Sequence, residues 1–215
     1  MSRIVVATGN AHKLEEYLSL LPGLELQSLT AFPPMDEVDE NASTFEGNAV
    51  LKAVAAHKHT GCITLADDSG IEVEALNWRP GIRSARYAPG SDADRVTALL
   101  NEMEGKPQRR ARFTCAIAVA GLEVSSARIQ LDHSEIDEAS YTWINGCLVV
   151  LGQVEGRLTE APRGGNGFGY DPIFELASGH TTAEITAAEK RRLSHRGVAS
   201  RQLLPLLSTL FSLTN

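Results

Sequence analysis

Residues 3–21 read RIVVATGNAHKLEEYLSLL, and this stretch indicates the class of fold. The short β-branched run before Thr8 is typical of a buried strand. The tight turn at Thr8–Asn10 then leads into a predicted amphipathic helix, with Asn10 as its N-cap. The apolar residues that define one helical face are Leu14, Tyr17, Leu18 and Leu21.

A strand-to-helix turn of this kind directs backbone N–H groups and the positive end of the helix dipole outward. Lys13 adds a full positive charge one turn into the helix. The stretch therefore predicts an anion site, although a turn that serves only packing explains the same residues. It lacks the longer glycine-rich loop of a P-loop.

Composition limits the classes of protein that the chain can represent. Its 215 residues suffice for one sizeable core, divided at most into two lobes. No run approaches 18 apolar residues and no basic-then-apolar leader is seen, so we expect neither a membrane span nor a secretory signal. Three widely spaced cysteines favour a reducing cytoplasm over a disulfide framework or a zinc site. A formal net charge of −7 argues against nucleic acid as the main partner.

Helical and strand-like segments are mixed without strict β–α–β alternation, which favours an α/β fold with a mixed sheet. We expect Pro205 to kink or interrupt the last helix and residues 121–146 to hold an additional hairpin. Helices are predicted at 44–60 and 91–103, with the final helices between about 187 and 208, and strands are predicted at 24–29, 62–67, 71–76, 111–120 and 147–158.

Two acidic pairs are candidates for chemistry. Asp67 and Asp68 end the predicted strand 62–67 and face opposite ways unless the next residues turn the chain. A carboxylate there can bind Mg²⁺ or activate a water, or it can simply cap a turn at Ser69-Gly70. Asp39 and Glu40 form the second pair, in a proline-containing loop that is equally consistent with a solvated charge run.

Two further clusters lie near the C-terminus. GGNGFGYD (residues 164–171) allows close backbone approach to a ligand, with Phe168 and Tyr170 available to stack; it also fits a flexible turn. KRRLSHR (residues 190–196) concentrates five basic or imidazole groups in an acidic chain, which suggests an electron-rich ligand or a solvated helical face.

Together these stretches resemble the inosine triphosphate pyrophosphatase family, enzymes that remove ITP, dITP and XTP from the nucleotide pool. Any single motif would be a weak match, but six occur in order over nearly the whole chain. They are TGNAHK, TFEGNAVLKA, LADDSGIEV, PGIRSARYA, GFGYDPIF and EKRRLSHRGVA.

The resemblance implies a single domain over residues 1–215, with an elongated mixed β-sheet flanked by helices. It also implies two lobes with a central substrate cleft, and a homodimer in the cytoplasm. The implied reaction is Mg²⁺-dependent hydrolysis of non-standard purine triphosphates to the monophosphate and pyrophosphate, with no nucleic-acid or membrane partner.

The resemblance also assigns roles to residues of this chain. Asp68 would be the general base and, with Asp39, a metal ligand, while Phe168 would stack on the purine. The implied substrate-binding residues are Thr8, Gly9, Asn10, Ala11, His12, Lys13, Ser69, Phe168, Gly169, Tyr170, Asp171, Lys190, His195 and Arg196.

Two departures from the family pattern bear on this assignment. Gly47 stands where the family usually has Glu, and Asp39 is one methylene shorter than the usual acidic ligand. Intact Asp67, Asp68 and Ser69 favour catalysis, whereas Gly47 is also compatible with a rival interpretation, a non-catalytic sensor that binds purine nucleotides.

Overall fold

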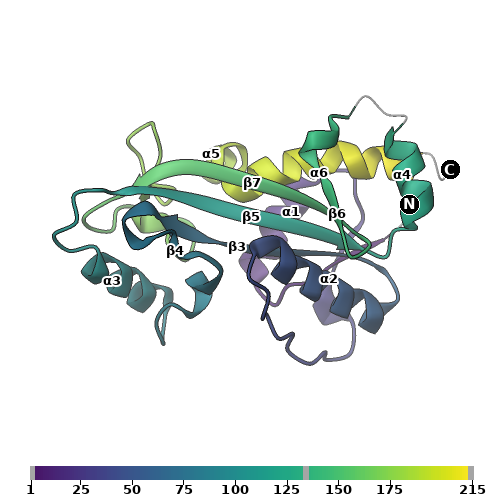
Figure 1. Cartoon of the computed structure of the whole chain (residues 1–215), viewed down its shortest axis with the longest axis horizontal. Coiled ribbons are helices and arrows are strands. Elements are labelled where there is room, and N and C mark those ends of the chain that lie inside the picture. Colours follow the sequence, from purple (N-terminus) through teal and green to yellow (C-terminus); the bar gives the residue numbers. More distant parts are fainter. Residues whose placement is uncertain (1–2, 133–135, 213–215) are drawn as a thin grey trace. The chain divides into compact units, whose positions relative to one another are not determined.

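The computed structural model describes residues 3–132 and 136–212, whose helices and strands are labelled in Figure 1, and these residues divide into two compact units. Of the described residues, unit 1 comprises 3–68, 115–132, 136–152 and 198–212, and unit 2 comprises Ser69–Thr114 and Gln153–Gly197. The boundary falls within three long strands, so each of these strands contributes to both units.

The sheet is mixed, as predicted. Its strand order is β2-β1-β3-β5-β7-β6, with β1 parallel to β2 and β3, and β6 antiparallel to β7. The register pairs Val6 with Leu65 at the end of β1. The strands of this path are β1 (Ile4–Val6), β2 (Leu26–Ser28), β3 (Ile63–Val73), β5 (Arg110–Ala120), β6 (Thr142–Ile144) and β7 (Cys147–Leu158).

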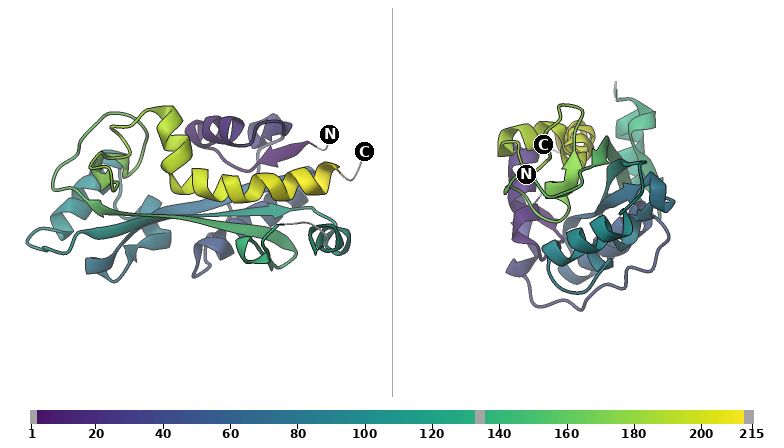
Figure 2. Two further views of the ribbon diagram at one scale, coloured as in Figure 1. Left: turned by 90° about the horizontal axis from the view of Figure 1, so that it is seen from above. Right: turned by 90° about the vertical axis from the view of Figure 1, so that its left-hand side faces the viewer.

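Helices cover both faces of the sheet in unit 1. Figure 2 shows α1 and α6 on one face and α2 and α4 on the other. Their bounds are α1 (Ala11–Leu20), α2 (Phe45–Thr60), α4 (Val124–Asp132) and α6 (His195–Ser212). The apolar core of this unit includes Ile4, Val6, Tyr17, Leu65, Ile117, Leu148, Leu203 and Leu207.

Unit 2 has its own core around the outer parts of β3, β5 and β7. It adds strands β4 (Arg79–Pro80) and β8 (Phe174–Glu175) and helices α3 (Asp92–Glu102) and α5 (Ala187–Leu193). Its core includes Ile71, Val73, Leu99, Met103, Phe113, Ile173 and Phe174. Short 3-10 helices occur at Leu29–Ala31, Glu74–Leu76, Gly81–Arg86, Glu138–Ser140 and Asp171–Ile173.

The ends of α2 are fixed by residues that the sequence marks clearly. The Thr44 hydroxyl caps the first turn by accepting the N–H of Gly47, and Gly61 ends the helix at φ 67°, in the left-handed region. Only glycine adopts that conformation without steric cost, so the predicted helix 44–60 is confirmed almost to the residue.

The prediction of two strands separated by a turn at Ser69-Gly70 is wrong, because β3 runs unbroken from Ile63 to Val73. Gly70 serves a different purpose there. A Cβ at this position would lie 2.4 Å from Ser84 Oγ and 2.5 Å from the Gly81 carbonyl oxygen. Glycine is required for close packing of a neighbouring segment against the strand, and the chain does not turn.

Three other expectations need correction. Leu18 is 53% exposed, so it lies off the buried face of α1. The last helix, α6, is not interrupted at Pro205, an exposed residue at which solvent can replace the lost hydrogen bond. α5 and α6 are separate helices that meet at Ser194. The described residues of 121–146 contain α4 and the single strand β6, and not a hairpin of their own; β6 pairs with β7, which begins at Cys147, and residues 133–135 lie outside the described part.

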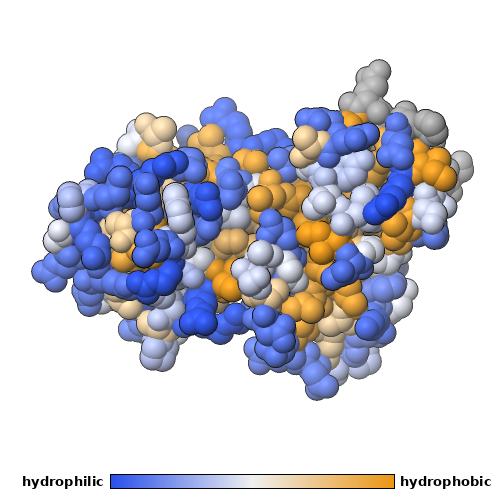
Figure 3. Space-filling view, in the orientation of Figure 1, coloured by the Kyte–Doolittle hydropathy of each residue, from blue (hydrophilic) through white to orange (hydrophobic). Residues whose placement is uncertain are grey.

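The described residues include no helix that is both long and apolar enough to cross a bilayer. On the face shown in Figure 3, apolar side chains gather over the part of unit 1 that carries α2 and α4. Leu51 on α2 and Ile129 on α4 are 37% and 59% exposed.

We expect Gly61→Ala to destabilise the protein by about 1 kcal/mol, because alanine in the left-handed region is strained. For a chain of this length this corresponds to a loss of about 2–4 °C in Tm. Gly165→Ala is the control, since Gly165 has no atom within 4 Å of its Cβ position and no left-handed φ. Equal Tm values for the two variants, measured by calorimetry, would contradict this account of the α2 terminus.

Candidate functional site

The turn after β1 holds its backbone through its own side chains. The Asn10 carboxamide caps α1 by accepting the N–H groups of His12 and Lys13, at 2.9 and 3.4 Å. The Thr8 hydroxyl accepts the N–H of Asn10 at 3.1 Å. Asn10 is therefore the N-cap that the sequence predicts, but its cap occupies two of the N–H groups that an anion would use.

Lys13 is paired with a carboxylate of β3. Its Nζ lies 2.9 Å from Oδ2 of Asp67, whose side chain is 2% exposed. This contact follows from the sheet register, since Asp67 lies two residues beyond Leu65, the partner of the last residue of β1. An anionic ligand at the turn would thus compete with Asp67 for the lysine.

Asp68 points to the opposite side of the strand, as alternation along a strand requires. Its Oδ2 accepts a hydrogen bond from Asn48 Nδ2 at 3.1 Å, and its Oδ1 lies 3.1 Å from Lys52 Nζ. Both partners belong to α2, which covers the face of the sheet opposite α1 (Figure 2). The strand thus separates the two adjacent carboxylates, and each has its own lysine.

The acidic loop before α2 contributes a third carboxylate. Glu40 Oε1 lies 2.8 Å from Lys52 Nζ, so one ammonium group bridges Glu40 and Asp68. Asp39 instead accepts a hydrogen bond from Asn41 at 3.1 Å. Of the two acidic residues in the loop, the structure places Glu40 with Asp68, whereas the family resemblance had directed attention to Asp39.

The electrostatics of this cluster reflect an excess of negative charge. Burial raises the pKa of Asp68 above its usual value, although the Lys52 charge and the Asn48 hydrogen bond oppose the shift. Burial would lower the pKa of Lys52, but the charges of Asp68, Asp67 and Glu40 together raise it. Lys13 is paired with Asp67, but the single charge of Lys52 cannot neutralise both Glu40 and Asp68, so an added cation would be attracted there.

Glu40 and Asp68 could bind a magnesium ion whose remaining ligands are waters or substrate phosphates. In the described part of the chain, no three His, Cys, Asp or Glu side chains are grouped as a metal centre. Mg²⁺ nevertheless binds commonly through one or two carboxylates, together with waters and substrate phosphates. Glu40 and Asp68, linked through Lys52, provide such a pair of hard oxygen ligands.

The substitution at Gly47 affects the helix cap. Thr44 is the N-cap of α2 and Gly47 is its N3 residue, the position at which Glu would complete a capping box. This chain keeps the Thr44 half of the box and lacks the other half. A Glu at position 47 would complete the box only if the loop moved, because a Cβ there would lie 2.6 Å from the Cβ of Ala42.

In unit 2, the glycine-rich stretch is organised by a buried acid. Oδ2 of Asp171 accepts the N–H of Phe168 at 2.8 Å and lies 2.7 Å from Lys190 Nζ, while Oδ1 accepts the Thr182 hydroxyl. Lys190 Nζ also lies 4.7 Å from the centre of the Phe168 ring, within cation–π range. Phe168 is therefore fixed at its backbone while its half-buried ring lies beside a cation.

His195 and Arg196, at the start of α6, are both buried in unit 2. The Arg196 guanidinium donates to Ser69 Oγ at 3.2 Å and lies 5.8 Å from the Phe168 ring centre. The His195 ring stacks on Phe113, with centroids 4.6 Å apart. Unit 2 thus brings together an aromatic ring and two cations, on segments that are far apart in the sequence.

Other residues predicted for the site have mainly structural contacts. Tyr170 is buried and its hydroxyl donates to the Ser84 carbonyl; burial raises its pKa to about 12. The N–H of Gly169 donates to Asp92 at 2.7 Å. Two residues of the cluster in unit 1, Asn48 and Lys52, were not singled out from the sequence. Their spacing of four residues, which places them on one helical face within TFEGNAVLKA, was the available signal.

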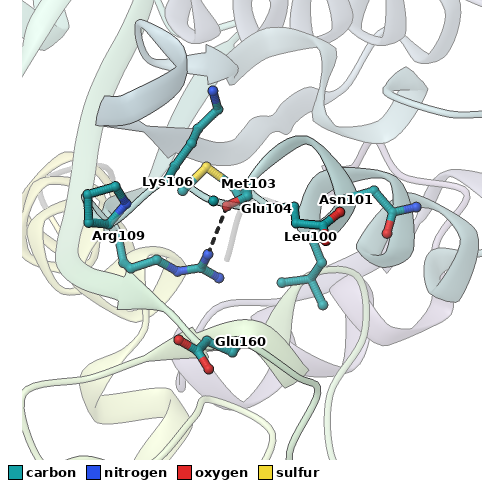
Figure 4. A pocket seen from close by; sticks show the side chains of 9 residues that line it. Leu100, Asn101, Met103, Glu104, Lys106, Arg109 and Glu160 are labelled. Atoms are coloured by element: carbon teal, nitrogen blue, oxygen red, sulfur yellow. Dashed lines mark hydrogen bonds between the residues drawn. The ribbon is translucent and has the colours of Figure 1, made fainter.

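A separate pocket of about 570 Å³ lies in unit 2, between the end of α3 and the start of β5 (Figure 4). Arg109 extends into it, and its guanidinium donates to the carbonyls of Met103, Leu158 and Thr159. A cation at the C-terminal end of a helix is favoured by the dipole. Arg109 thus cross-links two chain segments, and Glu104 and Glu160 oppose an anionic ligand.

The mixed sheet, the strand–turn–helix and the carboxylate–lysine cluster define an α/β protein with a charged polar site. Comparison with known proteins is more specific: the Ham1 family matches residues 4–206, and the chain belongs to that family. A dITP/XTP pyrophosphatase of Symbiobacterium thermophilum is 44% identical over 97% of this chain and 96% of that protein. Another, from Geobacillus kaustophilus, is 43% identical over 94% of this chain and 93% of its own.

Solved structures agree with this assignment. A HAM1 protein from Coxiella burnetii is 39% identical and superposes with a TM-score of 0.79, covering 97% of this chain and 99% of that one. The Staphylococcus aureus Ham1 protein is 35% identical with a TM-score of 0.78, covering 96% and 98%. These relatives confirm the mixed sheet with flanking helices that the family resemblance implies.

We expect Asp68→Asn to raise Tm at neutral pH, because burial raises the pKa of the Asp68 carboxyl. A carboxyl whose pKa is raised on folding costs stability once it ionises, so that cost grows as pH rises above the unfolded-state value of about 4. The difference between variant and wild type should therefore shrink towards pH 4. Thermal unfolding across this range measures it.

Asp94→Asn is the matched control with the opposite sign. Hydrogen bonds from Ser91 lower the pKa of Asp94, so its ionised form stabilises the fold at neutral pH and this contribution is lost as pH falls. The Asn variant should have a lower Tm than wild type at neutral pH. A lower Tm for Asp68→Asn as well would contradict this expectation. It would show that Lys52 and Asn48 fully offset the cost of burying the ionised Asp68 carboxylate.

Proposed function

We propose that this protein is a pyrophosphatase that hydrolyses non-standard purine nucleoside triphosphates, namely dITP, ITP and XTP, to the monophosphate and pyrophosphate. The observation that carries the proposal is the buried Asp68, held by Asn48 and Lys52 beside Glu40, in a chain whose relatives at 44% identity are named for this activity. Removal of such nucleotides prevents their incorporation into DNA and RNA.

Asp68 is the general base of the proposed reaction. It takes a proton from the attacking water, whose oxygen bonds to the α-phosphorus while the bond from that phosphorus to the bridging oxygen breaks. Burial raises the pKa of Asp68, which makes it a stronger base than an exposed carboxylate. Asp68 and Glu40 would hold Mg²⁺, which supplies charge neutralisation to the phosphates when bound.

Two lysines serve the phosphates in this proposal. Lys13 follows the Thr8–Asn10 turn, and Lys52 projects from α2 between Glu40 and Asp68. Each lysine is paired with a carboxylate in the structure. On binding a triphosphate, each lysine would exchange its carboxylate partner for a phosphate group. Ala11 and His12 form the first turn of α1, directly after the Thr8–Asn10 turn, and would lie next to the phosphates in this proposal.

The purine would be bound by unit 2. Phe168 offers its ring for stacking, which does not discriminate between bases. Lys190, His195 and Arg196 lie in the same unit, and N–H donors favour the 6-oxo group of hypoxanthine or xanthine over the 6-amino group of adenine. A donor left facing a donor costs on the order of 1–3 kcal/mol, which supplies the selectivity.

The sensor alternative lacks a specific supporting observation, because Asp68 is intact and is held by Asn48 and Lys52. We further propose a homodimer in the cytoplasm. The family resemblance implies it, and the exposed Leu51 and Ile129 provide apolar surface that a second subunit could cover.

Pyrophosphate release from dITP, ITP, XTP, GTP and ATP, with and without Mg²⁺, tests the activity directly. We expect Mg²⁺-dependent turnover of the first three substrates at rates at least about 10-fold above ATP, a difference of about 1.4 kcal/mol in the barrier. Asp68→Asn should abolish turnover without unfolding the protein. Binding of ITP by wild-type protein without any turnover would support the sensor instead.

The acidic loop allows a test of which carboxylate holds the metal. We expect Glu40→Gln to raise the Mg²⁺ concentration for half-maximal rate by about 10-fold or more, because it removes a charged oxygen ligand. Asp39→Asn is the matched control, one residue away with its own partner in Asn41, and should change that concentration less than about 2-fold. If Asp39→Asn instead raises the Mg²⁺ concentration for half-maximal rate more than Glu40→Gln does, Asp39 and not Glu40 is the metal ligand.

A further inference from the structure

Asn48 is a fully buried polar residue whose side chain bonds in two directions. Its Oδ1 accepts the backbone N–H of Ala42 at 3.0 Å, and its Nδ2 donates to Asp68 Oδ2 at 3.1 Å. The Ala42 N–H can only donate and an ionised Asp68 can only accept, so one orientation of the amide satisfies both. Asn48 therefore connects the acidic loop to the carboxylate of β3.

Gly47 permits the loop to approach closely enough for this connection. A Cβ at position 47 would lie 2.6 Å from the Cβ of Ala42 and 3.3 Å from Thr44 Oγ1. Any side chain would therefore push the loop away from the helix at Ala42. The residue that departs from the family pattern thus lies where the loop and α2 are in closest contact.

The position of Ala42 determines where Glu40 can reach. Glu40 is two residues before Ala42, and its carboxylate meets Lys52 Nζ, which also contacts Asp68. Asn48 and Lys52 lie one turn apart on α2 and hold Asp68 by its two different oxygens. Loop, helix and strand are thereby joined through one buried amide and one ammonium group.

We propose that Asn48 is a positioning residue that couples the acidic loop to Asp68, and that Gly47 is the steric condition for this coupling. The coupling holds Glu40 and Asp68 on one side of α2 before a cation binds, so less ordering is required at binding. This inference rests on the proposed function for its catalytic consequence, while the coupling itself concerns only the contacts of the folded chain.

The test compares Asn48→Ala and Gly47→Ala with wild type, with Asn41→Ala as the control in the same loop. Asn48→Ala should raise the Mg²⁺ concentration for half-maximal ITP hydrolysis by about 10-fold or more, as loss of a partner to a metal ligand does. Gly47→Ala should raise it by about 3-fold, since it keeps both bonding groups but displaces the loop. The KM for ITP at saturating Mg²⁺ should change much less in both.

Two further readouts do not depend on turnover. Mn²⁺ binding to substrate-free protein, followed by electron paramagnetic resonance, should weaken in both variants and remain unchanged in Asn41→Ala. The Ala42 amide should exchange with solvent slowly in wild type and at least about 10-fold faster in Asn48→Ala. If Asn48→Ala fails to fold, Gly47→Ala carries the test by the same measurements.

The outcomes separate the inference from the proposed function. A lower Tm with unchanged Mn²⁺ affinity would show that Asn48 is merely structural and overturn the proposal, as would unchanged Ala42 exchange. Wild-type protein that releases no pyrophosphate would refute the proposed function, while Mn²⁺ binding and amide exchange would still decide whether the coupling exists.

Discussion

The structure of the candidate site depends on one electrostatic constraint, which is that Asp67 and Asp68 are adjacent, buried and negatively charged. A strand resolves part of this conflict by directing the two side chains to opposite faces, where Lys13 and Lys52 meet them separately. Glu40 then adds a third carboxylate next to Lys52. Two carboxylates, Glu40 and Asp68, therefore share one lysine, which leaves one negative charge unbalanced. Buried carboxylates that cost stability are expected where function requires them.

This constraint also explains why the surrounding elements end where they do. β1 stops at Val6, and the Thr8–Asn10 turn begins α1 close enough for Lys13 to reach Asp67. α2 begins at the Thr44 cap, which places Asn48 on its second turn and Lys52 one turn later, facing Asp68. The caps therefore set the helical register, and the register sets which side chains meet the strand.

Glycine has a different function at each of three positions that look alike in the sequence. Gly61 supplies a left-handed residue at the end of α2, Gly70 allows Ser84 and Gly81 to pack against β3, and Gly47 allows the acidic loop to touch α2. Only the first is a conformational requirement. The other two depend on which segment lies opposite, so they belong to tertiary packing and not to local chain geometry.

The sequence by itself determined the helix α2, the long strands β5 and β7, the mixed sheet and the motifs that indicate the Ham1 family, because caps and hydrophobic periodicity are local signals. Asp68, Lys13 and the stretch 164–171 with Phe168 could also be identified from the sequence as candidate site residues. Only the tertiary structure placed Glu40 with Asp68, revealed Lys52 and Asn48, made β3 continuous through Ser69-Gly70 and carried α6 through Pro205. These outcomes depend on which distant side chain or solvent satisfies each buried charge and backbone group, and sequence spacing does not encode that information.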